Sequence, residues 1–356
     1  MSAELAEARE ELRAVARALL AKSGPQPDWQ LLAGSGWPGL EVAPGLGGGG
    51  ATLAEVAVIA EELGRALAVS PFLGTAVLGV GTLAALRPTA GRDELLSDVA
   101  AGRRRVSVAM ATGDDAVTGD AAPFRVEHAG GRLVLHGQAE FVPDAVGADR
   151  ILVMAREPSG VPVVVVLESA RLRIEPQPVL DSTRHLAVIT ADRIEADEAA
   201  LWQLAGDPGA AAEALADRAS LAVACDSLGV SQAVLAATVS YVGQRYQFGR
   251  PIGSFQAVKH ACADMLVQIS VARELVHEAA AAVAEGTLGA AAAVSMAKSY
   301  ACMAAVEVAG KAMQLHGGMG YTWESGIHAS LKRAALNRSL FGSPVAHRQR
   351  LARRYG

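Results

Sequence analysis

From Asp207 onward the chain carries a continuous helical pattern, and this pattern constrains the fold more than any other feature of the sequence. The alanine-rich segment 210–246 predicts a helix far longer than the mean of about 12 residues. Pro208 stands where a helix start tolerates proline. Further helices are predicted over 255–285, 290–315, 327–340 and 343–354. Long neighbouring helices of this kind are typical of a helical bundle.

Two polar, glycine-rich segments interrupt the helical pattern, at residues 245–259 and 314–321. Glycines let the backbone approach a ligand closely, and an arginine presents a planar fork to a pyrophosphate group. The two breaks together predict a site for a ligand with phosphates and a planar ring. Two ordinary turns between helices remain the alternative.

Composition excludes several classes of protein. A net charge of −5 argues against a nucleic-acid-binding protein, which needs a basic surface. The first 21 residues mix acidic and basic side chains, so they do not form a signal peptide. The apolar helices contain interspersed polar residues, and no membrane span is predicted. Cys225, Cys262 and Cys302 lack metal-ligand spacing, so we expect buried thiols in a reducing cytoplasm and no metal site.

Two other sequence patterns precede this helical region, first a helical one and then a β-strand one. Residues 2–22, 52–67, 77–86 and 92–101 read as helices. Short β-branched runs then follow at 106–110, 132–136, 151–154 and 161–167, separated by Gly, Pro and Asp. The predicted fold is therefore α+β: an N-terminal helical domain (1–104), a middle antiparallel β domain (105–200) and a C-terminal four-helix bundle (201–356).

The two breaks also resemble the motifs of a known family. The patterns Arg245-x-x-Phe248-Gly249-x-x-Ile252-x-x-x-Gln256 and Gln314-x-x-Gly317-Gly318-x-Gly320-Tyr321 are similar to those of the acyl-CoA dehydrogenases. The resemblance covers most of the chain. It implies that Arg245 and Phe248 contact FAD across a subunit interface, and that Gln256 belongs to the same cofactor site. It also implies that Gln314, Gly317 and Gly318 hold the adenosine-diphosphate end.

The same resemblance implies α,β-dehydrogenation of an acyl-CoA thioester, with a carboxylate base and FAD as hydride acceptor. It places the flavin ring against two turns that correspond here to 111–113 and 141–143. Both turns lack some of the side-chain hydroxyls that the family uses. Most of the family carries its base in a turn that corresponds to 340–343, where Phe341 replaces the glutamate. The second family position for the base is Ala219.

Asp226 is therefore the candidate catalytic base, because it is the only charged residue between Arg218 and Arg245. It lies two helical turns after Ala219, on nearly the same face. A carboxylate buried beside flavin and an acyl chain would have a raised pKa, which suits a base. A structural or flavin-side role and a solvated or interface position remain open. His316 is expected to be a packing or an FAD-adjacent histidine rather than a proton carrier. If the chain binds substrate, the backbone N–H of Phe341 is expected to polarise the thioester.

The resemblance is strongest to short actinobacterial chains that pair with a different subunit. It implies an oxidoreductase of lipid or steroid catabolism, acting on an acyl-CoA substrate that includes steroid-derived CoA esters. The expected partners are a second acyl-CoA dehydrogenase-like subunit in a heterotetramer, or copies of itself, and an electron-acceptor flavoprotein. Two alternatives are kept: a non-catalytic subunit that completes a partner's FAD site, and a flavin monooxygenase of the same fold.

Overall fold

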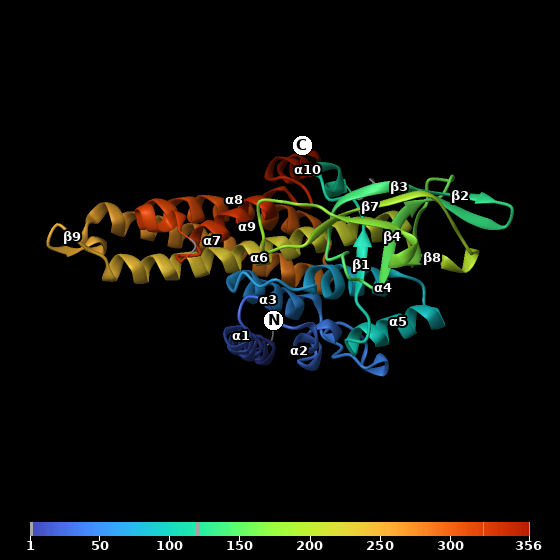
Figure 1. Cartoon of the computed structure of the whole chain (residues 1–356), viewed down its shortest axis with the longest axis horizontal. Helices are drawn as coiled ribbons and strands as arrows, with labels where there is room; N and C mark the ends of the chain where they lie inside the picture. Colours follow the sequence, from blue (N-terminus) through green and yellow to red (C-terminus); the bar gives the residue numbers. More distant parts are fainter. Residues whose placement is uncertain (1–2, 119–121, 323, 356) are drawn as a thin grey trace.

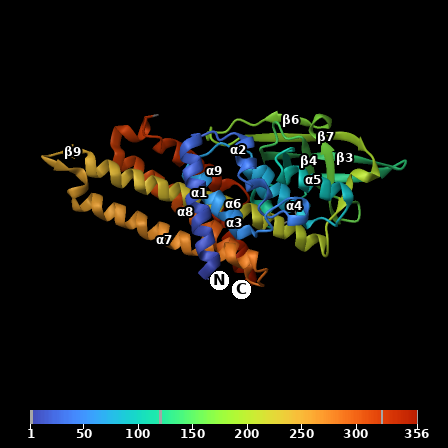
Figure 2. The same ribbon diagram turned by 90° about the horizontal axis from the view of Figure 1, so that it is seen from below.

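The computed structural model describes residues 3–118, 122–322 and 324–355. A β-sheet forms one end of the elongated molecule and a helical bundle forms the other, with the hairpin β9–β10 at the far tip (Figures 1 and 2). The N-terminal helices pack on one side, and α10 lies on the opposite side in Figure 1. This arrangement confirms the α+β fold expected from the sequence.

The N-terminal part is helical, as predicted. A π-helix at Leu73–Gly79 continues directly into α4 and lies against the first strand. Thr52 caps α3 through a capping box with Glu55, which explains why this helix begins where it does. The helices are α1 (Ala3–Ser23), α2 (Trp29–Gly34), α3 (Leu53–Arg65), α4 (Val80–Ala85) and α5 (Ala90–Ala100).

Eight strands build one sheet in the order β6-β7-β3-β2-β4-β5-β8, and β1 pairs with β4 outside this path. The pairings are antiparallel except β1 with β4 and β2 with β4, so the expected antiparallel sheet is mixed at β4. The last strand, β8, lies just beyond residue 200, the expected end of the β domain. The strands are β1 (Val106–Ala109), β2 (Phe124–Ala129), β3 (Arg132–Pro143), β4 (Arg150–Arg156), β5 (Pro162–Glu168), β6 (Arg173–Pro176), β7 (Leu186–Ala196) and β8 (Leu201–Gln203).

The C-terminal bundle is organised around α6, which contacts α3, α7, α8 and α9. Asp207 caps α6 by accepting the N–H groups of Gly209 and Ala210. A two-stranded hairpin, β9 (Tyr246–Gln247) and β10 (Arg250–Pro251), joins α6 to α7. The helices are α6 (Pro208–Gln244), α7 (Gln256–Ala284), α8 (Ala290–His316), α9 (Ile327–Ser339) and α10 (Pro344–Tyr355).

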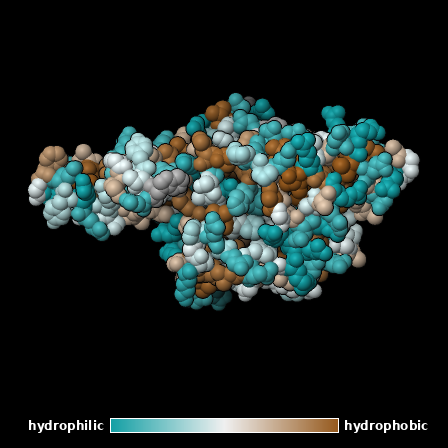
Figure 3. All heavy atoms as spheres, viewed as in Figure 1, coloured by the Kyte–Doolittle hydropathy of each residue, from teal (hydrophilic) through white to brown (hydrophobic). Residues whose placement is uncertain are grey.

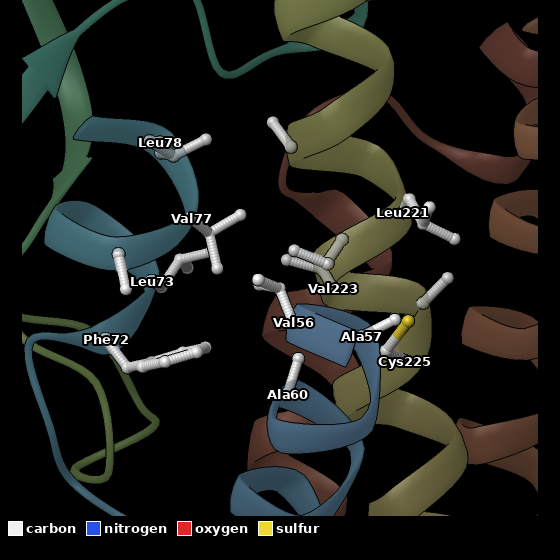
Figure 4. Packing of buried hydrophobic residues seen from close by; sticks show 14 of the residues in the cluster. Val56, Ala57, Ala60, Phe72, Leu73, Val77, Leu78, Leu221, Val223 and Cys225 are labelled. Carbon is white, nitrogen blue, oxygen red and sulfur yellow. The ribbon is translucent and has the colours of Figure 1, made fainter. Parts of the chain in front are cut away.

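One part of the main core lies between α3, the π-helix and α6, where Figure 4 shows their apolar side chains meeting. Two glycines let the backbones of α3 and α6 touch. A Cβ at Gly229 would lie 1.8 Å from the carbonyl oxygen of Glu61, and one at Gly64 would lie 2.2 Å from that of Asp226. Among the described residues, α6 alone is long and apolar enough to cross a membrane, but 67% of its most apolar window is buried in the protein.

Candidate functional site

Asp226 is buried in the middle of α6, where three side chains hold its carboxylate. Nε and Nη2 of Arg333 donate to the two carboxylate oxygens at 3.0 and 2.7 Å. Nδ2 of Asn337, one turn further along α9, donates to Oδ1 at 2.6 Å. Arg184, from the segment between β6 and β7, adds an ion pair at 3.2 Å. Asp226 therefore joins α6 to α9 and to the β domain.

These partners overturn the raised pKa expected for Asp226. Burial by itself would raise the pKa, but Arg333 and Arg184 outweigh it and lower the pKa to about 2. A carboxylate held this way is a very weak base at neutral pH, and its lone pairs already accept hydrogen bonds. The geometry therefore favours the structural role among those left open. Sequence analysis missed Arg333 and Arg184, because neither lies near Asp226 in the chain.

A small cavity of about 20 Å³ adjoins this cluster. Its apolar walls include Leu63, Phe72 and Leu73, and Asp144 shares its polar side with the two arginines. Burial raises the pKa of Asp144 to about 6, although its carboxylate accepts the N–H of Gly74. Such a volume holds about one water molecule, so the cavity offers no room for an acyl chain.

The loop after α9 is closed around Phe341, the residue that the sequence resemblance aligns with the family glutamate. The Phe341 side chain is fully buried, and its backbone is in the left-handed region with φ 55°. Its N–H donates to the carbonyl of Thr112 at 2.6 Å, and its carbonyl accepts from Nε2 of His347 at 2.9 Å. Both backbone polar groups are thus used inside the chain.

This bonding corrects the expectation that the Phe341 N–H polarises a thioester, because that donor is already engaged. Lys298 fixes the same loop from α8. Its buried ammonium donates to the carbonyls of Asn337 at 3.1 Å and Gly342 at 2.8 Å, and burial lowers its pKa. Sequence analysis did not single out this lysine. A lone lysine in the apolar run 290–305 was the available signal.

The two turns expected beside a flavin ring are bonded to the rest of the chain. The Thr112 hydroxyl donates to the backbone carbonyl of Glu140 at 2.9 Å. The backbone carbonyl of Thr112 accepts the N–H of Phe341. The N–H of Phe141 donates to Oε1 of Gln177 at 2.6 Å. The one side-chain hydroxyl in segments 111–113 and 141–143 is therefore already committed to a backbone acceptor.

The six residues predicted to contact a cofactor lie away from this closed region, and all six are exposed. Phe248, at the hairpin tip, is 89% exposed and has a φ of 52°. Arg245 ends α6, and its carbonyl accepts the N–H of Ile252. Figure 3 shows that this end of the molecule projects from the body. The chain does not enclose these residues itself.

The structure brings the two glycine-rich breaks to the same end of the bundle. The rings of Tyr241 and His316 stack with centroids 4.3 Å apart and an interplanar angle of 10°. The Tyr241 hydroxyl donates to the His316 carbonyl at 3.3 Å. Tyr241 lies one turn before Arg245, and His316 lies between Gln314 and Gly317. This stack therefore connects the two halves of the predicted cofactor site.

The three cysteines are the next candidates. All three cysteines are free thiols. Burial raises the pKa of Cys225 well above its usual range, so its thiol is unreactive. Within residues 3–118, 122–322 and 324–355, no cluster of His, Cys, Asp and Glu has the arrangement of a metal site.

Family models match both helical parts of the chain. The model for the C-terminal domain of acyl-CoA dehydrogenases matches residues 209–356, and the N-terminal domain model matches 4–103. The acyl-CoA dehydrogenase IpdE2 of Mycobacterium tuberculosis is 33% identical over 317 residues, covering 89% of this chain and 82% of that protein. This chain belongs to the acyl-CoA dehydrogenase family. The resemblance seen in the sequence and the expected enzyme class are confirmed.

A further relative and two solved structures are similar to this chain over nearly its whole length. IpdE2 of Mycolicibacterium smegmatis is 30% identical over 351 residues, covering 98% of this chain and 94% of that protein. A structure described as a Tcur3481-Tcur3483 steroid ACAD variant has a TM-score of 0.86 at 29% identity, covering 98% and 97% of the two chains. The ChsE4-ChsE5 complex of Mycobacterium tuberculosis shares the fold, with a TM-score of 0.88 at 24% identity over 98% and 96%.

Proposed function

We propose that this chain is one subunit of a heteromeric, FAD-dependent acyl-CoA dehydrogenase. In this enzyme a second acyl-CoA dehydrogenase-like chain supplies the base. The observation that carries the proposal is that Phe341, which the resemblance aligns with the family glutamate, is fully buried and has both backbone polar groups engaged. Ala219, at the other family position, has no carboxylate. Asp226 is held as an ion by two arginines.

The residues at the outer end of the bundle fit one half of an FAD site. Arg245 offers a guanidinium fork suited to a pyrophosphate group, and Gly317 and Gly318 offer exposed backbone. Phe248 and Gln256 would complete this half. FAD, when bound, supplies the hydride acceptor. Because these groups point into solvent in the single chain, a second chain is needed to exclude water from the cofactor.

Exposed apolar side chains on the outer face of α7 are evidence for a partner chain at the same end of the bundle. Leu266, Val267 and Val271 are 51%, 63% and 41% exposed and lie on neighbouring turns of one helix. Exposed apolar side chains that gather on one face indicate a protein contact. The face follows directly on the hairpin that carries Phe248. A second dehydrogenase-like chain would thus cover the apolar face and the cofactor together.

The substrate proposed is an acyl-CoA, with steroid-derived CoA esters as the first class to test. This choice is supported by the similarity to a structure described as a steroid ACAD. An electron-acceptor flavoprotein would reoxidise the cofactor. The three free thiols are compatible with a cytoplasmic location.

The test is to express the chain alone and together with second acyl-CoA dehydrogenase-like chains of the same genome. Mass and flavin absorbance are measured on each purified product. We expect flavin and acyl-CoA-dependent bleaching only in a mixed complex. Replacing the partner's base by glutamine should abolish bleaching and leave flavin bound. A homo-oligomer of this chain that holds FAD and is bleached by acyl-CoA would contradict the proposal.

A further inference from the structure

A cavity of about 450 Å³ lies between α1, α3 and α7, and none of the six predicted cofactor residues lines it. In Figure 2 the first turns of α1 lie beside the end of α7. The inner walls of the cavity are apolar and built from small side chains, which leaves the space open. They include Ala57, Val58, Cys225, Val276 and Ala280, all of them buried. Pockets that bind small molecules have about this volume and this kind of lining.

The cavity stays open because the first half of α1 is joined to α3 through long side chains. Nε of Arg9 donates to Oε1 of Glu55 at 2.7 Å, and Nη1 of Arg13 lies 2.9 Å from Oε1 of Glu61. Glu61 is buried, and Nε2 of Gln232 on α6 donates to its Oε1 at 2.8 Å. The arginines thus hold α1 away from α3, and the alanines beneath them do not fill the gap.

The charge left at the rim of this cavity is negative. Arg9 and Arg13, which line it from α1, are already paired with carboxylates of α3. From the other side α7 contributes three exposed carboxylates, those of Glu274, Glu278 and Glu285. At 3.6 residues per turn they fall on one face of α7, within about 40°. Within residues 3–118, 122–322 and 324–355 none of the three makes an ion pair.

We propose that this cavity binds a small organic cation, an amine or a quaternary ammonium that carries a hydrocarbon body. The ammonium group meets the carboxylates of α7, and the hydrocarbon body fills the apolar interior. The described part of the chain has no metal-ligand cluster, and a hydrated metal ion would gain nothing from apolar walls. A fatty acid would suit the walls, but its carboxylate would be repelled by three like charges. The site is distinct from the proposed FAD site and requires neither FAD nor a partner chain.

The test is calorimetry on the full chain with butyl-, hexyl- and octyltrimethylammonium. Burial of each added CH₂ group should tighten binding about fourfold, because about 0.8 kcal/mol is gained per group. Octanoate and 1-octanol are the matched anionic and neutral compounds. We expect no binding of octanoate and weaker binding of 1-octanol than of octyltrimethylammonium. A saturating concentration of octyltrimethylammonium should also raise the Tm, because the ligand binds only the folded chain.

Variants separate the contribution of charge from that of the apolar interior. The double variant Glu274→Gln/Glu278→Gln should bind octyltrimethylammonium about threefold to tenfold more weakly and leave binding of 1-octanol unchanged. Ala281→Phe on α7 fills the cavity and should weaken both compounds more than tenfold. Ala6→Phe fills it from α1 and repeats that test should the first variant fail to fold. Glu11→Gln, an exposed residue of α1 outside the lining, is the control and should bind as the native chain does.

Three results would overturn the proposal. Equal affinities for the ammonium, the alcohol and the carboxylate would show a surface without charge preference. An affinity that does not change with chain length would show ion pairing outside the cavity. Loss of octyltrimethylammonium binding on addition of the second dehydrogenase-like chain would show that this chain, not a small molecule, occupies the cavity. Flavin content measured on the same mixed complex tests the FAD proposal separately, so either proposal can fail alone.

Discussion

Arg333 of α9 donates two hydrogen bonds to the carboxylate of Asp226 of α6, and both side chains are buried. Breaking such a pair from one side leaves a charge without compensation. That loss destabilises proteins by about 3–5 kcal/mol. The pair therefore matters more for the assembly of the helices than for proton transfer.

Asp226→Ala should accordingly lower the free energy of unfolding by about 3–5 kcal/mol. Asp226→Asn should lower it somewhat less, because the amide still accepts one hydrogen bond. Chemical denaturation measures both. Asp98→Asn, which weakens the ion pair of a half-buried carboxylate with the exposed Arg103, should cost less than about 1 kcal/mol and serves as the control. Native stability in Asp226→Ala would contradict the structural role.

Stability should also depend on Asp144, which is partly buried and has a pKa raised to about 6 in the folded chain. Because the pKa of Asp144 is raised in the folded chain, its contribution to the free energy of unfolding is fully present below the unfolded pKa. This contribution is lost as the pH rises through about 6. Between pH 4 and pH 7 we expect a loss of roughly 3 kcal/mol from this group. Asp144→Asn should flatten that part of the profile. An unchanged profile in the variant would show that another group titrates.

Gly229→Ala should separate α3 from α6, because the added Cβ would lie 1.8 Å from the Glu61 carbonyl oxygen. We expect a loss of several kcal/mol, on the order of the larger core defects. Gly243→Ala lies on the same helix with nothing within 4 Å of its Cβ. It should be neutral or gain about 0.5–1 kcal/mol. Thermal melts of the two variants compare the sites directly.

Arg245→Ala should reduce the FAD content of the mixed complex and leave its helical circular dichroism unchanged. Arg245→Lys should restore little, because the planar fork is lost. Arg125→Ala removes an exposed arginine on β2 and should leave the FAD content at the native level. Full flavin occupancy in Arg245→Ala would place the pyrophosphate elsewhere.

Phe341→Glu should not create a dehydrogenase. The side chain replaces a fully buried ring, and the adjacent N–H is engaged by Thr112. We expect lower stability, because an unpaired carboxylate is buried, and no bleaching of flavin by acyl-CoA. Phe341→Leu is the matched control for lost ring volume. Bleaching that appears with Phe341→Glu and not with Phe341→Leu would show that the loop still reaches substrate.

The sequence predicted local features well and long-range bonding poorly. The runs at 106–110, 151–154 and 161–167 are strands, because β-branched residues fit a pleated, buried surface. Strand β7 was missed, since Thr190, Asp192 and Arg193 interrupt its apolar pattern. The pKa of Asp226 was predicted from burial alone, whereas Arg333 decides it from 107 residues away. Bonding of this kind cannot be read from periodicity.

Helix α6 runs without interruption from the sheet to the hairpin. At a rise of 1.5 Å per residue, Asp226 and Arg245 lie roughly 28 Å apart along one rod. A tilt of a few degrees at the Asp226 ion pair would therefore displace the guanidinium end by an ångström or more. Substitutions in the interior of this chain can thus lower its affinity for a ligand at the distant end of α6, without contacting that ligand.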